Sequence, residues 1–261
     1  MSETSVADRL YGAGAPALEL DGVTRHFGAL AALSGVTMRI SAGERRAILG
    51  SNGAGKTTLF NAVTGEFPLT AGRIRFFGED ISELPTQERI RRGLRRTYQI
   101  SQLFGRLTVL DSVFLACRGV SGRRFSLRRP DASDVSMMQA RSIITAVHLD
   151  DESDRLVSTL SHGQQRQLEI ALALAGAPRL ILFDEPAAGL SPSERRDLVA
   201  ILSALPKHIG YIIIEHDLDV ALRVADYVSI MHNGRLFKEG TPEQIENDPE
   251  VQDIYLGHKH H

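Results

Sequence analysis

The sequence predicts an α/β fold in which a mainly parallel β-sheet carries an N-terminal antiparallel β-subdomain and an inserted α-helical subdomain. Three observations lead to this prediction. The stretch RRAILGSNGAGKTTLF runs from an apolar strand through a Gly-rich loop into a helix. The apolar runs LILF and YIII lack polar alternation, as do strands that are buried on both faces of a parallel sheet. Residues 85–160, between the loop and these runs, show mostly helical spacing.

Composition suits a single globular domain. The 261 residues are 43% hydrophobic and 24% charged, which is enough for one α/β core with an insertion. A net charge of −2 gives no case for nucleic acid as a partner. The single cysteine, Cys117, fits a reducing compartment. Since the chain shows neither a signal-peptide pattern nor an apolar run of about 18 residues, we expect it not to cross a membrane.

The N-terminal part predicts a flexible lead followed by a small antiparallel layer. Residues 1–16 are small and polar with scattered Gly and Pro, so we expect one ordered domain over 17–257. Residues 17–27 and 34–41 alternate apolar and polar side chains with a period of two, as half-buried strands do. A turn over residues 28–33 is expected to join them.

The Gly-rich loop has the spacing of a phosphate-binding loop. Gly50, four further residues and then Gly55-Lys56-Thr57 satisfy the pattern G-x-x-x-x-G-K-[ST]. Glycines let backbone N–H groups turn inward around a phosphate, and the helix N-terminus adds partial positive charge. Lys56 supplies an ammonium for the β- and γ-phosphates, and Thr57 a hydroxyl for Mg²⁺. The residues expected to hold the nucleotide are Gly50, Ser51, Asn52, Gly53, Ala54, Gly55, Lys56, Thr57 and Thr58. The loop predicts a P-loop NTPase core.

The middle of the chain predicts a helical insertion over residues 85–160. GRIRFFGEDI indicates a strand and turn, and PTQERIRRGLRR a short basic helix that ends near Gly93. Further helices are expected within 107–117 and 135–149. From Arg89 to Arg129 there are eleven arginines and one carboxylate. This arginine band is either a solvated helical face or a surface that meets acidic partner loops or anionic headgroups.

The second half returns to alternating helices and strands. A helix is expected to open after Ser161, and Ser191 is the expected N-cap of SPSERRDLVAILSAL. PRLILFDEP and HIGYIIIEHD indicate two buried strands. The tail predicts a hairpin around Asn233-Gly234 and then a capped helix.

Two acids close the first of these buried strands. Asp184 can hold Mg²⁺ or its waters, and Glu185 can polarise a water for in-line attack on the γ-phosphate. Without a phosphate loop they would be interpreted as strand-end carboxylates facing solvent. Together with the loop they predict a site that hydrolyses a nucleoside triphosphate.

The segment LSHGQQR, which precedes these acids, resembles the LSGGQ signature of the ABC ATPases, with His162 in place of the first Gly. Other motifs of that family follow in the expected order. Phe27 resembles the A-loop aromatic that stacks on the base, although a core position is the alternative, and Gln99 resembles the Q-loop glutamine that ties Mg²⁺ to the insertion. Residues 188–191 resemble the D-loop and His216 the γ-phosphate sensor. The resemblance implies that Ser161, Gly163 and Gln164 contact the ATP of an opposite subunit.

Within this family, GQQRQLEIALAL, DEPAAGLSP and EGTPEQIENDPEVQDIYLG resemble ATPases of importers for branched-chain amino acids and of the related urea and amide importers. The resemblance implies ATP and Mg²⁺ as cofactors and a second ATPase subunit bound head-to-tail. It also implies membrane-spanning permease partners, a solute-binding protein, and a peripheral place on the cytoplasmic face of the inner membrane. Lipopolysaccharide export is an alternative, because its ATPase has a similar tail. A chromosome or DNA-repair ATPase is less favoured, because the chain has no sustained heptads.

Overall fold

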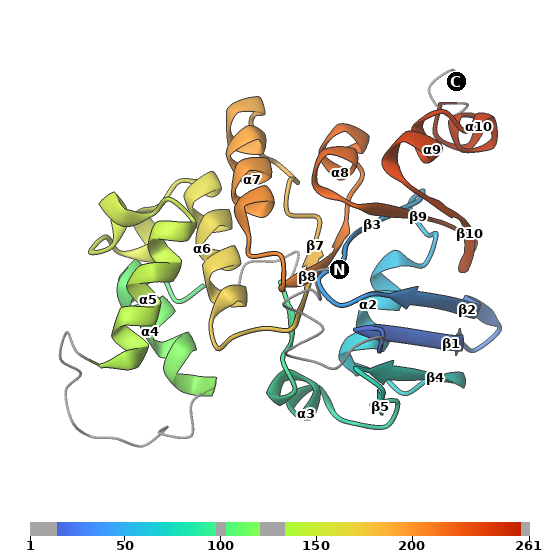
Figure 1. The fold of residues 1–261 in the computed structure, drawn as a ribbon, viewed down its shortest axis with the longest axis horizontal. Coiled ribbons are helices and arrows are strands. Elements are labelled where there is room, and N and C mark those ends of the chain that lie inside the picture. The colour runs from blue at the N-terminus through green and yellow to red at the C-terminus, as the bar shows by residue number, and fades with distance from the viewer. Residues whose placement is uncertain (1–14, 98–102, 121–133, 257–261) are drawn as a thin grey trace, which may run out of the picture.

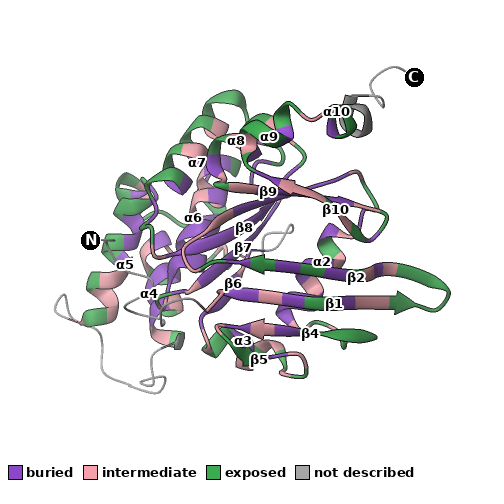
Figure 2. Cartoon of the chain, turned by 45° about the vertical axis from the view of Figure 1, so that its right-hand side comes forward, coloured by how far each residue is buried: buried purple, intermediate pink, exposed green. Residues whose placement is uncertain are grey.

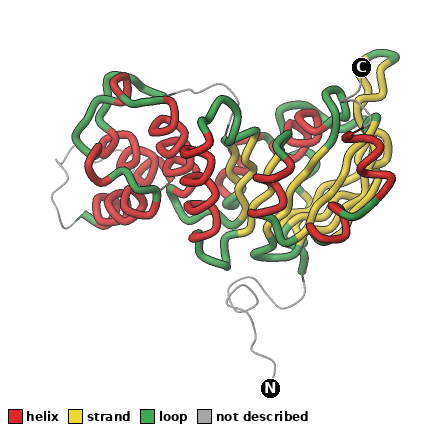
Figure 3. Tube along the Cα trace, turned by 90° about the horizontal axis from the view of Figure 1, so that it is seen from above, coloured by secondary structure: helices red, strands yellow, loops and turns green. Residues whose placement is uncertain are grey.

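The structure is a computed structural model that describes residues 15–97, 103–120 and 134–256. The strands lie at one end of the molecule. Three helices gather at the other end (Figures 1 and 3), namely α4 (Val109–Val120), α5 (Val135–Ala146) and α6 (His162–Leu174). In the described part of the chain, no helix has both the length and the apolar character that crossing a bilayer requires.

The N-terminal layer is a four-stranded antiparallel sheet in the order β2-β1-β4-β5. Its strands are β1 (Leu18–Phe27), β2 (Leu30–Ile40), β4 (Ala71–Phe76) and β5 (Glu79–Asp80). The antiparallel pairing of the first two strands was predicted, but the expected turn over 28–33 was too long. Phe27 already pairs with Leu30, because Gly28 takes a φ of 59° and lets the chain reverse within two residues.

The central layer is a six-stranded sheet in the order β10-β9-β3-β8-β7-β6. Its strands are β3 (Arg45–Leu49), β6 (Leu94–Arg96), β7 (Leu180–Asp184), β8 (Gly210–Ile214), β9 (Tyr227–His232) and β10 (Arg235–Gly240). All neighbours pair in parallel except β9 and β10, which form the predicted hairpin at Asn233-Gly234. Every residue of β7 and β8 is buried (Figure 2), which accounts for their unbroken apolar runs. The mainly parallel sheet is confirmed.

The remaining helices surround this sheet. They are α2 (Lys56–Thr64), α3 (Thr86–Arg91), α7 (Pro192–Ala204), α8 (Leu218–Val224), α9 (Pro242–Glu246) and α10 (Pro249–Leu256), with short 3₁₀ turns at Asp150–Glu152 and Val157–Thr159. Ser191 caps α7 as predicted, since its hydroxyl accepts the Glu194 N–H and the Glu194 side chain returns to the Ser191 N–H. Thr241 caps α9 in the same way, through Gln244.

The predicted insertion, residues 85–160, contains elements of two kinds. Helices α4 and α5 pack on α6 through a buried cluster that includes Val113, Cys117 and Ile144. Leu94–Arg96, in contrast, form β6, which pairs with β7 at the edge of the six-stranded sheet. The basic helix expected over PTQERIRRGLRR accordingly ends at Arg91, and β6 follows it.

Two arginines of the described part of the arginine band make internal contacts. Arg89 is buried, and its guanidinium donates to the carbonyl oxygens of Ala62 and Val63, both at 2.8 Å, so that it caps the C-terminal end of α2. Arg92 pairs with Glu79 and Glu88. These arginines therefore stabilise the fold. Arg123, Arg124, Arg128 and Arg129 lie outside the described residues.

Candidate nucleotide site

The phosphate loop joins β3 to α2 in a shape that excludes side chains at two glycines. A Cβ at Gly50 would lie 2.3 Å from the Met231 carbonyl oxygen, and one at Gly55 would lie 2.7 Å from that of Ala32. Gly55 also takes a φ of 99°. Because only glycine fits both positions, the loop can turn tightly and then open directly into α2 at Lys56.

A cavity of about 500 Å³ lies beside this loop. Five segments that are far apart in the sequence converge on it: β2, the phosphate loop, the residues that follow β7, those that follow β8, and the turn of the β9–β10 hairpin. Its lining comprises Leu30, Ala31, Ala32, residues 52–58, Glu185, His216, Asn233 and Gly234. The structure therefore brings most of the predicted loop residues together with the predicted base and the predicted sensor.

Lys56 lies folded over its own loop. Its Nζ donates to the carbonyl oxygens of Gly50, at 2.7 Å, and Ser51, at 3.1 Å, and the residue is only 5% exposed. Burial lowers the pKa of this amine, while the negative charges of Glu185 and Asp184 act in the opposite direction. The ammonium thus lies at the centre of the loop and within the field of both carboxylates.

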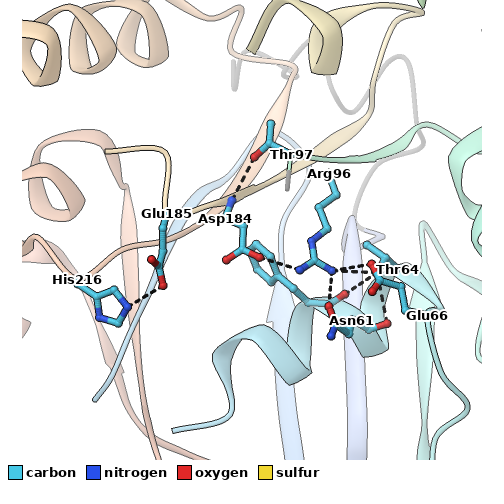
Figure 4. A network of polar contacts seen from close by, with 9 residues as sticks. Asn61, Thr64, Glu66, Arg96, Thr97, Asp184, Glu185 and His216 are labelled. Atoms are coloured by element: carbon cyan, nitrogen blue, oxygen red, sulfur yellow. Dashed lines mark hydrogen bonds and ion pairs between the residues drawn. The ribbon is translucent and has the colours of Figure 1, made fainter. Parts of the chain in front are cut away.

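Glu185 and His216 form a polar pair across the ends of two parallel strands (Figure 4). His216 Nε2 lies 2.7 Å from Glu185 Oε1. The backbone of Glu185 takes a φ of 49°, an uncommon conformation for a residue with a side chain, and its N–H donates to the Ile214 carbonyl oxygen. Such left-handed residues are enriched at functional sites, where the surrounding structure maintains the strain.

Asp184 is buried directly before Glu185, with 2% exposure. Its Oδ2 accepts from Arg96 Nη2 at 2.7 Å, and its N–H donates to Thr97 Oγ1 at 3.2 Å. Sequence reasoning identified the acid but missed Arg96, which lay among many arginines without a distinguishing pattern.

A third acid, Glu215, was not predicted. It accepts the N–H of Ala187 at 2.8 Å and that of His216 at 3.3 Å. Burial raises the pKa of this carboxyl to about 7, and nearby Glu185 and Asp217 act in the same direction. A signal was present in the sequence, because Glu215 follows the apolar run of β8 as Asp184 follows that of β7.

Ser161, Gly163 and Gln164 lie at the start of α6, where they line a separate cavity of about 270 Å³ beside α7. The Ser161 hydroxyl accepts the Gln164 N–H and Gln164 returns to the Ser161 N–H, so the pair caps the helix. A Cβ at Gly163 would lie 2.3 Å from Glu194 Oε1, so a larger residue there would displace the Glu194 side chain. These three residues are not part of the cavity at the phosphate loop of their own chain.

Phe27 stands apart from the loop cavity. Phe27 is 45% exposed, so the core alternative is wrong; its ring meets that of Phe67 edge-on at 5.5 Å, and the Arg25 guanidinium lies 4.5 Å from its centroid. It is not among the residues that line the cavity. Gln99 lies outside the described residues.

The donors near the loop suit Mg²⁺ only together with phosphate. In the ranges that the structure describes, no three His, Cys, Asp or Glu side chains are grouped to hold a metal ion by themselves. Thr57 and Asp184 offer a hydroxyl and a carboxylate, which are hard oxygen ligands. That set fits an ion whose remaining ligands are water and nucleotide phosphates.

Comparison with known proteins agrees with this geometry. The family described as ABC transporter matches residues 33–188, which is more than half of the chain. The chain belongs to the ABC transporter family of ATP-binding proteins. It is a nucleotide-binding ATPase of a membrane transporter. A second family, described as branched-chain amino acid ATP-binding cassette transporter, matches residues 239–261.

Several characterised ABC proteins are similar over nearly their whole length. BraF of Pseudomonas aeruginosa, a high-affinity branched-chain amino acid transport ATP-binding protein, is 36% identical over 252 residues, covering 93% of this chain and 98% of BraF. LivG of Escherichia coli, which has the same description, is 34% identical over 250 residues, with the same coverage. The ADP conformation of MJ1267, an ATP-binding cassette of an ABC transporter, superposes with a TM-score of 0.82 at 32% identity, covering 94% of this chain and 100% of that one.

Proposed function

We propose that this ABC ATPase hydrolyses MgATP at the cytoplasmic face of the inner membrane and powers import of branched-chain or similar hydrophobic amino acids. The observation that carries the chemistry is the convergence of the phosphate loop, Glu185 and His216 on one cavity. A loop that binds phosphate, a carboxylate that can take a proton and an imidazole that can donate one are the groups that hydrolysis of a terminal phosphate needs.

The phosphate loop holds the triphosphate. Residues 50–58 surround the β- and γ-phosphates with backbone N–H groups, and the N-terminus of α2 adds its partial positive charge. Lys56 exchanges its two carbonyl acceptors for phosphate oxygens, which are stronger acceptors for a cation. Phe27, exposed at the end of β1, stacks on the purine base.

Thr57, Asp184 and Gln99 are the side chains that we assign to Mg²⁺. When bound, Mg²⁺ neutralises charge on the β- and γ-phosphates. Thr57 lines the cavity and Asp184 closes β7. Their hydroxyl and carboxylate oxygens, with the Gln99 amide, orient the metal–nucleotide complex relative to the loop.

Glu185 is the general base and His216 the γ-phosphate sensor. The 2.7 Å contact between them fixes the carboxylate at the cavity edge, where it accepts a proton from the attacking water. The left-handed backbone at Glu185 directs this side chain away from the course of β7.

Ser161, Gly163 and Gln164 complete the site of a second ATPase subunit. The support is their position on α6, away from the phosphate-loop cavity of their own chain. In a head-to-tail pair, the Ser161 hydroxyl and the Gly163 N–H face the γ-phosphate held by the other subunit. Binding of ATP then closes the pair and hydrolysis reopens it.

The names of similar proteins support the choice of solute and partners. BraF and LivG are described as branched-chain amino acid transport ATP-binding proteins, and the similarity covers 93% of this chain. We therefore infer membrane-spanning permease subunits and a solute-binding protein as partners, with the second ATPase chain either identical or a paralogue. A lipopolysaccharide exporter and a DNA-repair ATPase are the alternatives. The match of residues 239–261 to the branched-chain amino acid ATP-binding cassette family favours the importer.

Uptake and copurification test the proposal together. In cells that lack this chain, uptake of labelled leucine should fall and return with the wild-type gene but not with Lys56→Ala, while uptake of labelled lysine stays unchanged. Untagged membrane partners that copurify with the chain should be importer permeases when they are identified by mass spectrometry. Unchanged leucine uptake, with exporter subunits in the purified complex, would favour the export alternative.

A further inference from the structure

We propose that Arg96 is a positioning residue that sets the metal-side carboxylate, Asp184, relative to the phosphate-loop helix. The inference deepens the proposed function and rests on its assignment of Asp184 to Mg²⁺. Arg96 ends the edge strand β6 and lies three positions before Gln99 in the sequence.

The geometry places one guanidinium between three elements (Figure 4). Arg96 Nη2 donates to Asp184 Oδ2 at 2.7 Å, across from β6 to the end of β7. Its Nη1 donates to Glu66 Oε1 at 2.9 Å and also to the Asn61 side-chain oxygen, on the helix that begins at the phosphate loop. The planar fork of arginine can span such acceptors at once, and a lysine ammonium cannot reproduce this.

The contact between Arg96 and Asp184 is buried, which increases its effect on the position of the carboxylate. The side chain of Arg96 is 5% exposed and that of Asp184 is 3% exposed, whereas Glu66 is 33% exposed. A buried carboxylate without a countercharge is costly, so the Arg96 guanidinium stabilises the Asp184 carboxylate and holds it in one orientation. The bond engages Oδ2 of Asp184.

The backbone supports the same arrangement. Thr97 follows Arg96, and its N–H donates to the Leu182 carbonyl oxygen at 2.9 Å. Its hydroxyl accepts the N–H of Asp184 at 3.2 Å. Arg96, the last residue of β6, therefore holds the side chain of Asp184, and Thr97, the next residue, holds its backbone, while Asn61 links the same guanidinium to α2. Outer contacts of this kind typically change metal affinity by about 10- to 100-fold when they are removed.

Nucleotide binding with and without metal separates this role from a general structural one. Arg96→Gln removes the charge but keeps a donor of smaller reach. We expect its affinity for ATP in EDTA to stay within about twofold of wild type, while the free Mg²⁺ concentration for half-maximal enhancement of ATP binding rises about tenfold. Arg96→Lys should lie between wild type and Arg96→Gln. Binding is followed with a fluorescent ATP analogue, and folding by the thermal midpoint.

Two matched variants decide the interpretation. Glu66→Gln removes the other acid that Arg96 pairs with, and we expect it to leave the Mg²⁺ requirement unchanged. If Glu66→Gln raises the Mg²⁺ requirement as much as Arg96→Gln does, the effect of Arg96 does not depend on Asp184, and the inference is overturned. Asp184→Asn tests the underlying metal assignment. If Asp184→Asn raises the Mg²⁺ requirement and Arg96→Gln does not, this inference alone fails; if neither variant does, the assignment of Asp184 fails. If Arg96→Gln does not fold, Arg96→Lys replaces it in the test. A Mg²⁺ requirement equal to that of wild type in Arg96→Lys would then overturn the inference about Arg96.

Discussion

Glu215 accepts the backbone N–H of Ala187 at 2.8 Å, and this bond joins the end of β8 to the turn that follows Glu185. The same carboxyl accepts the N–H of His216, so one buried group holds the backbone of the candidate sensor and the backbone two residues after the candidate base. A carboxyl that is 3% exposed, with Glu185 and Asp217 nearby, resists ionisation. The polar pair of the site therefore rests on a group that changes charge near neutral pH.

The first prediction concerns stability against pH. The folded pKa of Glu215 is raised from 4.5 to about 7, so its contribution is fully present below about pH 4.5 and is lost as pH rises through 7. The loss approaches about 3 kcal/mol. Glu215→Gln keeps an acceptor for Ala187 but cannot ionise. Between pH 5 and 7.5, wild type should lose free energy of unfolding relative to this variant, as measured by urea titration at each pH.

The matched control for that titration is Glu79→Gln. Glu79 is an exposed acid of β5 that pairs with Arg92, and Arg92 lowers its pKa, so its removal should not reproduce the trend between pH 5 and 7.5. A constant difference between wild type and Glu215→Gln over that range would contradict the raised pKa.

The second prediction concerns the base. Glu185→Gln should lower kcat for ATP hydrolysis by about 10²-fold or more, the effect of losing a general base, while ATP still binds and the closed pair accumulates. The amide keeps the size of the carboxylate and can still meet His216 Nε2, so geometry is conserved. Steady-state phosphate release and equilibrium binding of ATP measure the two effects. A near-normal rate in the variant means that another group takes the proton.

The third prediction concerns the aromatic ring of Phe27. Phe27→Ala should weaken ATP binding by about 1 kcal/mol, roughly fivefold in KM, and leave kcat little changed, because stacking does not take part in the chemistry. Phe237→Ala is the control, since Phe237 is similarly exposed, at 43% compared with 45%. Equal KM values for the wild type and both variants would remove Phe27 from the site. Stacking reads no base edges, so GTP should compete well with ATP.

Sequence patterns predicted those elements that are long enough to show a periodicity or that contain a complete motif. The apolar runs of β7 and β8 and the loop into α2 are each local, and each matched the structure. The three residues of β6 and the seven of α8 are too short to show a period, and they were missed.

The residues of the candidate site also differ in whether a local sequence pattern could predict them. Lys56 and Glu185 belong to motifs that a few adjacent residues define. Arg96 acts on Asp184, 88 positions away, and Glu215 acts on Ala187, 28 positions away, so only the folded chain shows these pairs. Ser161 is a different case, because its proposed role depends on a second subunit.

The fourth prediction tests that composite site by mixing two inactive variants. Lys56→Ala disables the phosphate loop. Ser161→Asp keeps an N-cap for α6, since Asp caps helices as well as Ser does, but its carboxylate repels the γ-phosphate across the interface. Each variant alone forms pairs with two broken sites. In a mixed pair, one site combines the intact loop of the Ser161→Asp chain with the intact signature of the Lys56→Ala chain. Equal mixing should therefore restore ATPase activity, to roughly a quarter of wild type by statistical pairing.

Controls show whether recovery of ATPase activity on mixing comes from a site shared between two subunits. Thr241→Asp makes the same change at the N-cap of α9, and it should retain full activity, which shows that the substitution itself does not unfold the chain. A mixture of wild type with Lys56→Ala shows whether a pair with one intact site turns over. With a paralogue as the native partner, the same exchange is made between the two chains. If Ser161 served the nucleotide of its own chain, every Ser161→Asp subunit would stay inactive and no mixing ratio would restore hydrolysis. Recovery that rises with the product of the two concentrations at low occupancy is what a signature acting across the interface requires.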